Sequence, residues 1–191
     1  MPGRLAAVLL LVVATACIAD RGASVAPVTT LSGSSSPLPP GTLAELKPMI
    51  DPLVRPLALR LTRGSLVDHA TGGPGPRPRH LALYVEPTTT FSDERFVATI
   101  APLAAAVTPF VFARWPDLES YDICQEPSPG VDDRPEPETV TVFEVSRDYA
   151  GGVDWRRAAL SRLVDDTANR RPGVLVAVTA RLRPVLDAAA R

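Results

Sequence analysis

The segment LALYVEPTTTFSDERFVATIAPLAAAVTPF, residues 81–110, decides the fold class of this chain. Its first five residues are a compact apolar run that ends at Glu86-Pro87, which is typical of a central strand. Ser92 can then cap a helix in which apolar residues recur every three or four positions. We therefore predict a strand at 81–85 and a helix that ends at about residue 114. The recurring apolar residues are Phe96, Ile100, Leu103, Val107 and Phe110.

Two prolines interrupt this predicted helix. Pro102 and Pro109 each lack the backbone N–H that a helix needs, so a kink, or a break near Val107, is the alternative. In that case residues 110–115 become a strand instead. We favour the continuous helix, followed by a strand at 118–126.

The C-terminal half repeats the pattern of strand and helix. Residues 139–146 are rich in β-branched side chains and predict a strand, and Asp154 can cap a second helix. An apolar run at 174–178 predicts another strand, and a short final helix at 184–190 completes the chain. From residue 80 the order is β-α-β-β-α-β, the ferredoxin-like order, with two helices on one face of an antiparallel sheet. The apolar face of the second helix comprises Trp155, Ala159, Leu163, Val164 and Thr167.

An N-terminal helix and an edge strand are added to this body. Thr42 and Glu45 form a capping box that predicts a helix at 43–50, and prolines at 52 and 56 prevent a long continuation. Alternating leucines predict an edge strand at 57–63, and the Gly/Pro-rich residues 72–78 predict a loop. The fold class is therefore α+β.

The first residues have the layout of an export signal. An apolar run begins at Leu5 after a single arginine and stops at Asp20, short of the roughly 20 residues that span a bilayer. The stretch Ala14-Thr15-Ala16-Cys17 resembles a bacterial lipobox, in which the cysteine becomes N-terminal and carries diacylglycerol and usually a third acyl chain. The first lipobox position is most often Leu, whereas this chain has Ala14. The alternative is an ordinary secretory signal that is cut after Ala16 or Ala19 and releases a free protein.

This resemblance implies three parts: a signal peptide at 1–16, a lipid-anchored tether at 17–41 and a single domain at 42–191. The tether is rich in Ser, Pro and Gly and has little apolar surface to bury. Two or three acyl chains hold a protein firmly on a membrane. Residues 1–40 are similar to the same region of short, uncharacterised lipoproteins of high-GC Gram-positive bacteria, and this similarity implies no activity.

Charge and cysteine content limit the partners. The net charge is −1, and −2 once Arg4 is removed with the signal peptide, so nothing attracts nucleic acid in general. Cys17 and Cys124 are the two cysteines. Lipidation of Cys17 leaves Cys124 as an unpaired, buried thiol, whereas a Cys17–Cys124 disulfide is the alternative that requires an unlipidated Cys17.

The most suggestive group of reactive side chains lies at 121–126. In a strand, Ser120, Asp122, Cys124 and Glu126 share one face. The two carboxylates disfavour a thiolate on Cys124, and neither His69 nor His80 forms a recognisable motif with it. A metal site of Asp122, Cys124 and Glu126 would mix hard and soft ligands without a histidine. We therefore interpret this strand as structural and assign no catalytic, cofactor-binding or metal-binding residue.

Two charged regions are candidate contact surfaces. The acidic connector predicts a solvated hairpin loop without EF-hand spacing, and a partner contact is expected there. A group of arginines late in the chain could face lipid headgroups. Neighbouring aspartates reduce its positive charge, and Arg162 can pair with Asp166 one helical turn further on. A solvated, mixed-charge face is favoured. The connector has carboxylates at 117, 119, 122, 126, 132, 133, 136 and 138, and the arginines are Arg156, Arg157, Arg162, Arg170, Arg171, Arg181 and Arg183.

Three functions follow from these patterns. The favoured one is a non-catalytic lipoprotein on the outer face of the cell membrane that binds an envelope protein or a small ligand. The second is a structural subunit of an envelope complex, which would show an exposed apolar patch on the open face of the sheet. The third is an enzyme, which would need a pocket where polar side chains converge.

Overall fold

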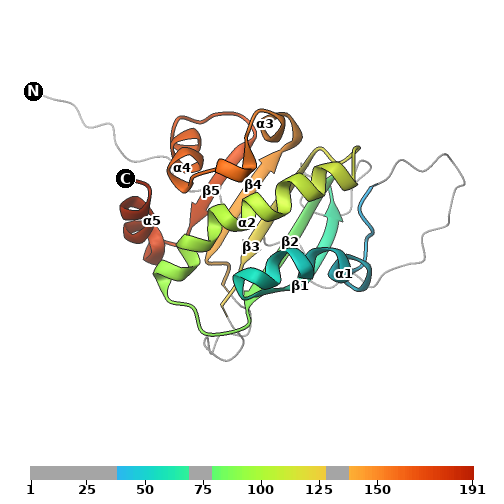
Figure 1. The fold of residues 1–191 in the computed structure, drawn as a ribbon, viewed down its shortest axis with the longest axis horizontal. Coiled ribbons are helices and arrows are strands. Elements are labelled where there is room, and N and C mark those ends of the chain that lie inside the picture. The colour runs from blue at the N-terminus through green and yellow to red at the C-terminus, as the bar shows by residue number, and fades with distance from the viewer. Residues whose placement is uncertain (1–37, 69–78, 128–137) are drawn as a thin grey trace, which may run out of the picture.

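The computed structural model describes residues 38–68, 79–127 and 138–191 of this chain. The predicted signal peptide, Cys17, nearly all of the tether and the loop at 72–78 lie outside these ranges. The described residues form one five-stranded sheet in which the strands follow their chain order (Figure 1). These strands are β1 (Leu59–Val67), β2 (His80–Pro87), β3 (Ser120–Gln125), β4 (Thr141–Ser146) and β5 (Val174–Val178).

The sheet is mixed, so the predicted ferredoxin-like antiparallel sheet is wrong. β2 pairs with β3 in parallel, whereas the other neighbouring strands are antiparallel. The helix between β2 and β3 returns the chain to the edge of the sheet at which β2 begins. The two adjacent strands therefore run in the same direction. Element order alone does not fix strand pairing, and the coarser α+β class is what the structure shows.

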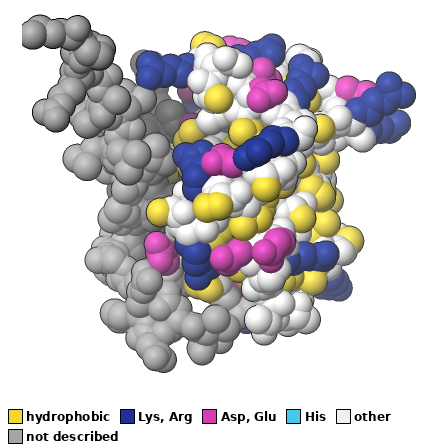
Figure 2. Space-filling view, turned by 90° about the vertical axis from the view of Figure 1, so that its left-hand side faces the viewer, with side chains coloured by type: hydrophobic (Ala, Val, Ile, Leu, Met, Phe, Trp, Pro, Cys, Tyr) yellow, Lys and Arg dark blue, Asp and Glu magenta, His cyan; other side chains and the backbone are white. Residues whose placement is uncertain are grey.

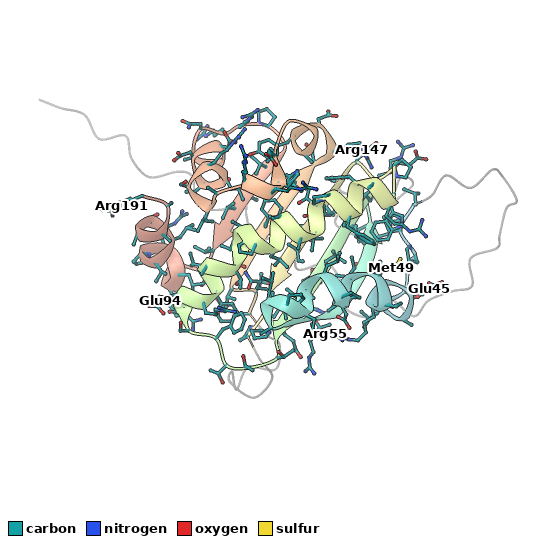
Figure 3. The ribbon with its side chains drawn as sticks, viewed as in Figure 1. Glu45, Met49, Arg55, Glu94, Arg147 and Arg191 are labelled. Atoms are coloured by element: carbon teal, nitrogen blue, oxygen red, sulfur yellow. The ribbon has the colours of Figure 1, made fainter. Side chains whose placement is uncertain are left out.

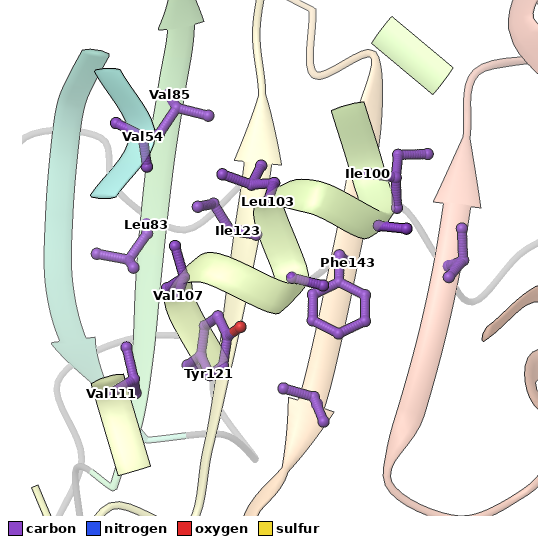
Figure 4. Packing of buried hydrophobic residues seen from close by; sticks show 14 of the residues in the cluster. Val54, Leu83, Val85, Ile100, Leu103, Val107, Val111, Tyr121, Ile123 and Phe143 are labelled. Atoms are coloured by element: carbon purple, nitrogen blue, oxygen red, sulfur yellow. The ribbon is translucent and has the colours of Figure 1, made fainter. Parts of the chain in front are cut away.

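Helix α2 (Asp93–Arg114) runs unbroken through Pro102 and Pro109. Ser92 caps it, because its hydroxyl accepts a hydrogen bond from the Arg95 N–H. The predicted continuous helix is confirmed, and the alternative strand at 110–115 is not formed. Burial offsets the two missing hydrogen bonds, since Ile100, Leu103 and Val107 pack over Ile123 and Phe143 of the sheet (Figure 4).

At the N-terminal side of the fold, α1 (Leu43–Val54) continues past its predicted end at residue 50 and through Pro52. A 3-10 turn, η1 (Arg55–Leu57), follows and leads into β1 at the edge of the sheet. Leu46, Ile50 and Val54 lie four residues apart and are fully buried, so packing outweighs the lost hydrogen bond. The predicted capping box is altered, because the Thr42 hydroxyl donates to the Glu45 carboxylate instead of accepting from the backbone.

The second predicted helix, from Trp155 to Thr167, is interrupted. Asp154 caps only a 3-10 turn, η2 (Trp155–Arg157), and the chain is extended at Ala158 and Ala159 before α4 (Leu160–Ala168) begins. Trp155 is buried and its indole N–H donates to the carbonyl of Ala150, which holds the turn against the core. The remaining elements are α3 (Arg147–Gly151), η3 (Ala180–Leu182) and α5 (Arg183–Ala189).

The main core lies between the sheet and the layer of α1, α2 and α4 (Figure 1). A row of edge-to-face ring contacts crosses it, from Phe112 through Tyr121 and Phe143 to Trp155. Among the described helices, α2 alone has the length and composition of a membrane span. Because 56% of its most apolar window is buried, it has the character of a core helix.

Candidate functional site

The opposite face of the sheet brings Ser120, His80 and Asp122 together. Parallel pairing places His80 of β2 beside Ser120 of β3, and Asp122 lies two residues further along β3. The His80 Nδ1 is 2.8 Å from the Ser120 hydroxyl oxygen, and its Nε2 is 3.4 Å from a carboxylate oxygen of Asp122. All three side chains are buried.

These side chains have the residue types of a catalytic triad but not its arrangement. In a working triad the carboxylate is hydrogen-bonded to the histidine and the serine is open to substrate. Here neither carboxylate oxygen of Asp122 has a hydrogen-bond partner, and Ser120 is only 8% exposed. We therefore assign no catalytic step to this group.

The alternation predicted for β3 is confirmed. Tyr121 and Ile123 lie in the core beneath the helices, and Cys124 packs with Ala82 and Tyr84 of β2 on the opposite face. Burial raises the pKa of Tyr121, whose hydroxyl is hydrogen-bonded to Thr108. Cys124 has no exposed surface, which agrees with the structural role that the sequence indicates.

The three candidate metal ligands of the sequence do not form a metal-binding group in the structure. They are Asp122, Cys124 and Glu126. Glu126 pairs with Arg63 of β1. Within the described ranges there is no group of three or more His, Cys, Asp or Glu side chains positioned to hold a metal. The residue that sequence reasoning missed is His80. The only available signal was its place at the start of an apolar strand, and its contact with Asp122 depends on the parallel register.

Two ion pairs join the edge strand to its neighbours. Arg60 pairs with Glu86, and Arg63 pairs with Glu126 while its guanidinium lies 4.1 Å from the ring centre of Tyr84. Burial raises the pKa of Glu126 above its ordinary value of 4.5, although the Arg63 charge acts in the opposite direction.

This raised pKa predicts a pH dependence of stability. The unfolded chain loses the Glu126 proton near pH 4.5, whereas the folded chain keeps it to higher pH. The contribution of Glu126 to folding stability is therefore present below pH 4.5 and is lost as the pH rises through the folded pKa. The melting temperature of the wild type should fall as the pH rises through the folded pKa of Glu126. This fall should be absent in Glu126→Gln and should remain in the exposed control Glu119→Gln. The same dependence of melting temperature on pH in the wild type and both variants would contradict the raised pKa of Glu126.

A small surface pocket of about 170 Å³ lies between the C-terminal half of α2 and the α3–η2 region. Its lining is mainly apolar, and its charged residue, Arg147, is already engaged. Figure 3 labels Arg147, which lies beside the C-terminal end of α2. Its guanidinium donates to the carbonyls of Phe112 and Trp115 at the end of α2 and to that of Leu118 before β3. The pocket is lined by Thr108, Pro109, Phe112, Arg147, Ala150, Gly151 and Trp155.

The outer face of α2 is unusually apolar. No charged residue occurs from Phe96 to Ala113, including the positions that face away from the sheet. Figure 2 shows hydrophobic side chains gathered towards its right-hand side, which is the side of the helical layer. We define the α2 outer face as the exposed residues Ala98, Pro102, Pro109 and Ala113.

The two charged regions of the sequence are the late arginines, several of which are paired with aspartates, and the acidic connector, of which only part is described. Arg162 and Arg171 both pair with Asp166, Arg157 pairs with Asp154, and Arg181 reaches Asp93. Four of the seven late arginines are therefore paired with aspartates, as expected for a mixed-charge face. Within the acidic connector, Asp122 and Glu126 are buried, and residues 128–137 lie outside the described ranges.

Comparison with known proteins found no relative. No family model matches the chain, and neither a curated protein nor a solved structure matches it.

Proposed function

We propose that this chain is a lipid-anchored protein of the outer face of the cell membrane, whose α+β domain is a non-catalytic binding module for an envelope protein. Cys17 carries the lipid in this proposal, and residues 17–41 tether the domain at 42–191. Two or three acyl chains provide the membrane affinity, so the surface of the domain is available for another partner.

The α2 outer face is the observation that carries the binding role. A surface helix normally presents charged side chains to water, and a helix that is apolar all round is normally buried. Contiguous exposed apolar surface on a soluble domain is typical of an interaction site. The small side chains of Ala98 and Ala113, and the ring faces of Pro102 and Pro109, allow a partner helix to approach closely.

A structural subunit of an envelope complex would have its exposed apolar patch on the open face of the sheet. Ala82, Tyr84 and Cys124 form an apolar cluster on the sheet face opposite the helices, but all three are buried. The α2 outer face, in contrast, is exposed and lies on the helical layer. This arrangement favours contact through α2 over contact through the sheet.

Site-specific photo-crosslinking in intact cells tests this role. A benzophenone amino acid in place of Ala98 or Ala113 is expected to give one discrete protein adduct, because both positions lie on the α2 outer face. The same group in place of Glu119, which is exposed near β3, serves as the matched control. An added Pro102→Arg substitution should abolish the adduct. Adducts of equal yield at all three positions, or none at the two α2 positions, would exclude this face as the binding surface.

A further inference from the structure

The small pocket between α2 and the α3–η2 region lies at the surface and has a mainly apolar lining. Pro109 and Phe112 contribute to it from α2, and Ala150 and Trp155 contribute from the other side. The indole N–H of Trp155 already donates to the carbonyl of Ala150, so this ring needs no polar partner in the pocket. Burial of an apolar group in this pocket is therefore favourable.

The volume of the pocket decides what kind of apolar group it holds. Pockets for small-molecule ligands usually measure about 300–1,000 Å³, whereas this pocket measures about 170 Å³. An apolar cavity of about 150 Å³ is large enough for one benzene molecule. The pocket therefore fits one aromatic ring or one large aliphatic side chain, which is how an anchor residue of a protein partner is held at an interface.

The pocket borders the α2 outer face. Pro109 belongs to both, and Ala113 lies one helical turn further along α2. On the α3 side, Gly151 lines the pocket, is exposed and has no atom of a more distant residue within 4 Å of the place that a Cβ would occupy. Gly151 thus leaves room for the backbone of a partner. A partner seated on the α2 outer face can therefore place one side chain in the pocket.

The charge in the pocket wall is positive and has no carboxylate partner among the described residues. Arg147, labelled in Figure 3, is half-buried, and three of its five N–H groups donate to neutral backbone carbonyls. These bonds hold the guanidinium in place but leave its charge, which the negative end of the α2 dipole offsets only in part. A carboxylate on the partner would offset the remainder.

We propose that the pocket receives one aromatic or large aliphatic side chain of the envelope protein, and that an aspartate or glutamate next to this anchor pairs with Arg147. Burial of the anchor contributes affinity, and the carboxylate sets the orientation of the partner. This inference rests on the proposed function, because it names the residue types through which the partner contacts the domain.

NMR titration of the isotope-labelled mature full-length protein tests the pocket directly. The probe is hydrocinnamate, which joins one ring to one carboxylate, and hydrocinnamamide is its uncharged counterpart. The indole N–H signal of Trp155 should shift progressively as hydrocinnamate is added. The amide should bind about two- to fivefold more weakly, as expected for the loss of one partly exposed ion pair.

The variant that closes the pocket is Gly151→Leu. Gly151 has a helical backbone as the last residue of α3, so leucine is tolerated there and its side chain occupies the opening. The shift of the Trp155 signal should disappear, and the yield of the photo-crosslinked adduct at Ala113 in cells should fall at least about tenfold. Gly41→Leu alters an equally open, exposed glycine that does not line the pocket, and it should leave both measurements unchanged.

Four results would count against the proposal, and they separate it from the proposed function. Failure of the wild type to bind hydrocinnamate would overturn the pocket without the need for any variant. Equal affinity for the acid and the amide would overturn the pairing with Arg147. An adduct of unchanged yield in Gly151→Leu would overturn the anchor and leave the α2 outer face as the binding surface. Binding of hydrocinnamate without any adduct at Ala98 or Ala113 would overturn the protein partner, and with it the proposed function, although the pocket itself binds its probe.

Discussion

A Cys17→Ala variant is expected to leave the membrane fraction completely and to appear as unanchored protein. Each buried CH₂ of an acyl chain contributes about 0.8 kcal/mol to membrane affinity, so loss of two or three chains removes the whole anchor. Within the described ranges, α2 has the composition of a membrane span. Because its most apolar window is more than half buried in the core, α2 is not expected to replace the lipid anchor. Fractionation of cells that express each protein, followed by immunoblotting, measures the change.

The matched control for this variant is Cys124→Ala. Cys124 is buried in the sheet, so its replacement should leave the protein in the membrane fraction. A high-salt wash separates lipid anchoring from attraction between arginines and anionic headgroups, because salt screens only the second. Cys17→Ala protein that still sediments with membranes after this wash would refute the lipid anchor.

The second large effect is expected from Arg147→Met, which should destabilise the domain by about 2–4 kcal/mol. The guanidinium donates to the carbonyls of Phe112 and Trp115 at the end of α2 and to that of Leu118 before β3. It also lies 4.8 Å from the ring centre of Phe112. Methionine keeps much of the side-chain volume of arginine but has no hydrogen-bond donor. The carbonyls of Phe112, Trp115 and Leu118 therefore lose the guanidinium that donates to all three.

Thermal unfolding measures this loss. For a domain of this size the melting temperature should fall by roughly 5–15 °C. Arg147→Lys keeps the charge but not the planar donor group, and its melting temperature should lie between those of the wild type and Arg147→Met. Arg162→Met removes an exposed pair with Asp166 and should cost less than about 1 kcal/mol. Equal melting temperatures for Arg147→Met and Arg162→Met would contradict the role of Arg147.

Local sequence signals predicted local structure well. Ser92 and the apolar spacing after it define α2, and alternation in β3 separates Tyr121 and Ile123 from Asp122 and Cys124. Each of these signals acts within one helix or strand. Such features are therefore accessible from sequence without knowledge of the tertiary fold.

Features that depend on distant residues were missed. Burial of Trp155 interrupts the predicted helix after Asp154, and burial of Ile50 and Val54 carries α1 beyond Pro52. The contact of His80 with Asp122 requires β2 and β3 to be adjacent and parallel, whereas the expected ferredoxin-like sheet was antiparallel. Strand pairing is a long-range choice that alternation within one strand does not encode.

The identity of the mature N-terminus tests the central proposal, a lipid-anchored envelope module, most directly. Mass spectrometry of the N-terminal peptide from the membrane-purified protein should show a chain that begins at Cys17. The mass of this peptide should include a thioether-linked diacylglycerol and, with full processing, an acyl group on the new amine. A peptide that begins at Cys17 with an unmodified thiol, or at Asp20 after cleavage behind Ala19, would contradict the proposal.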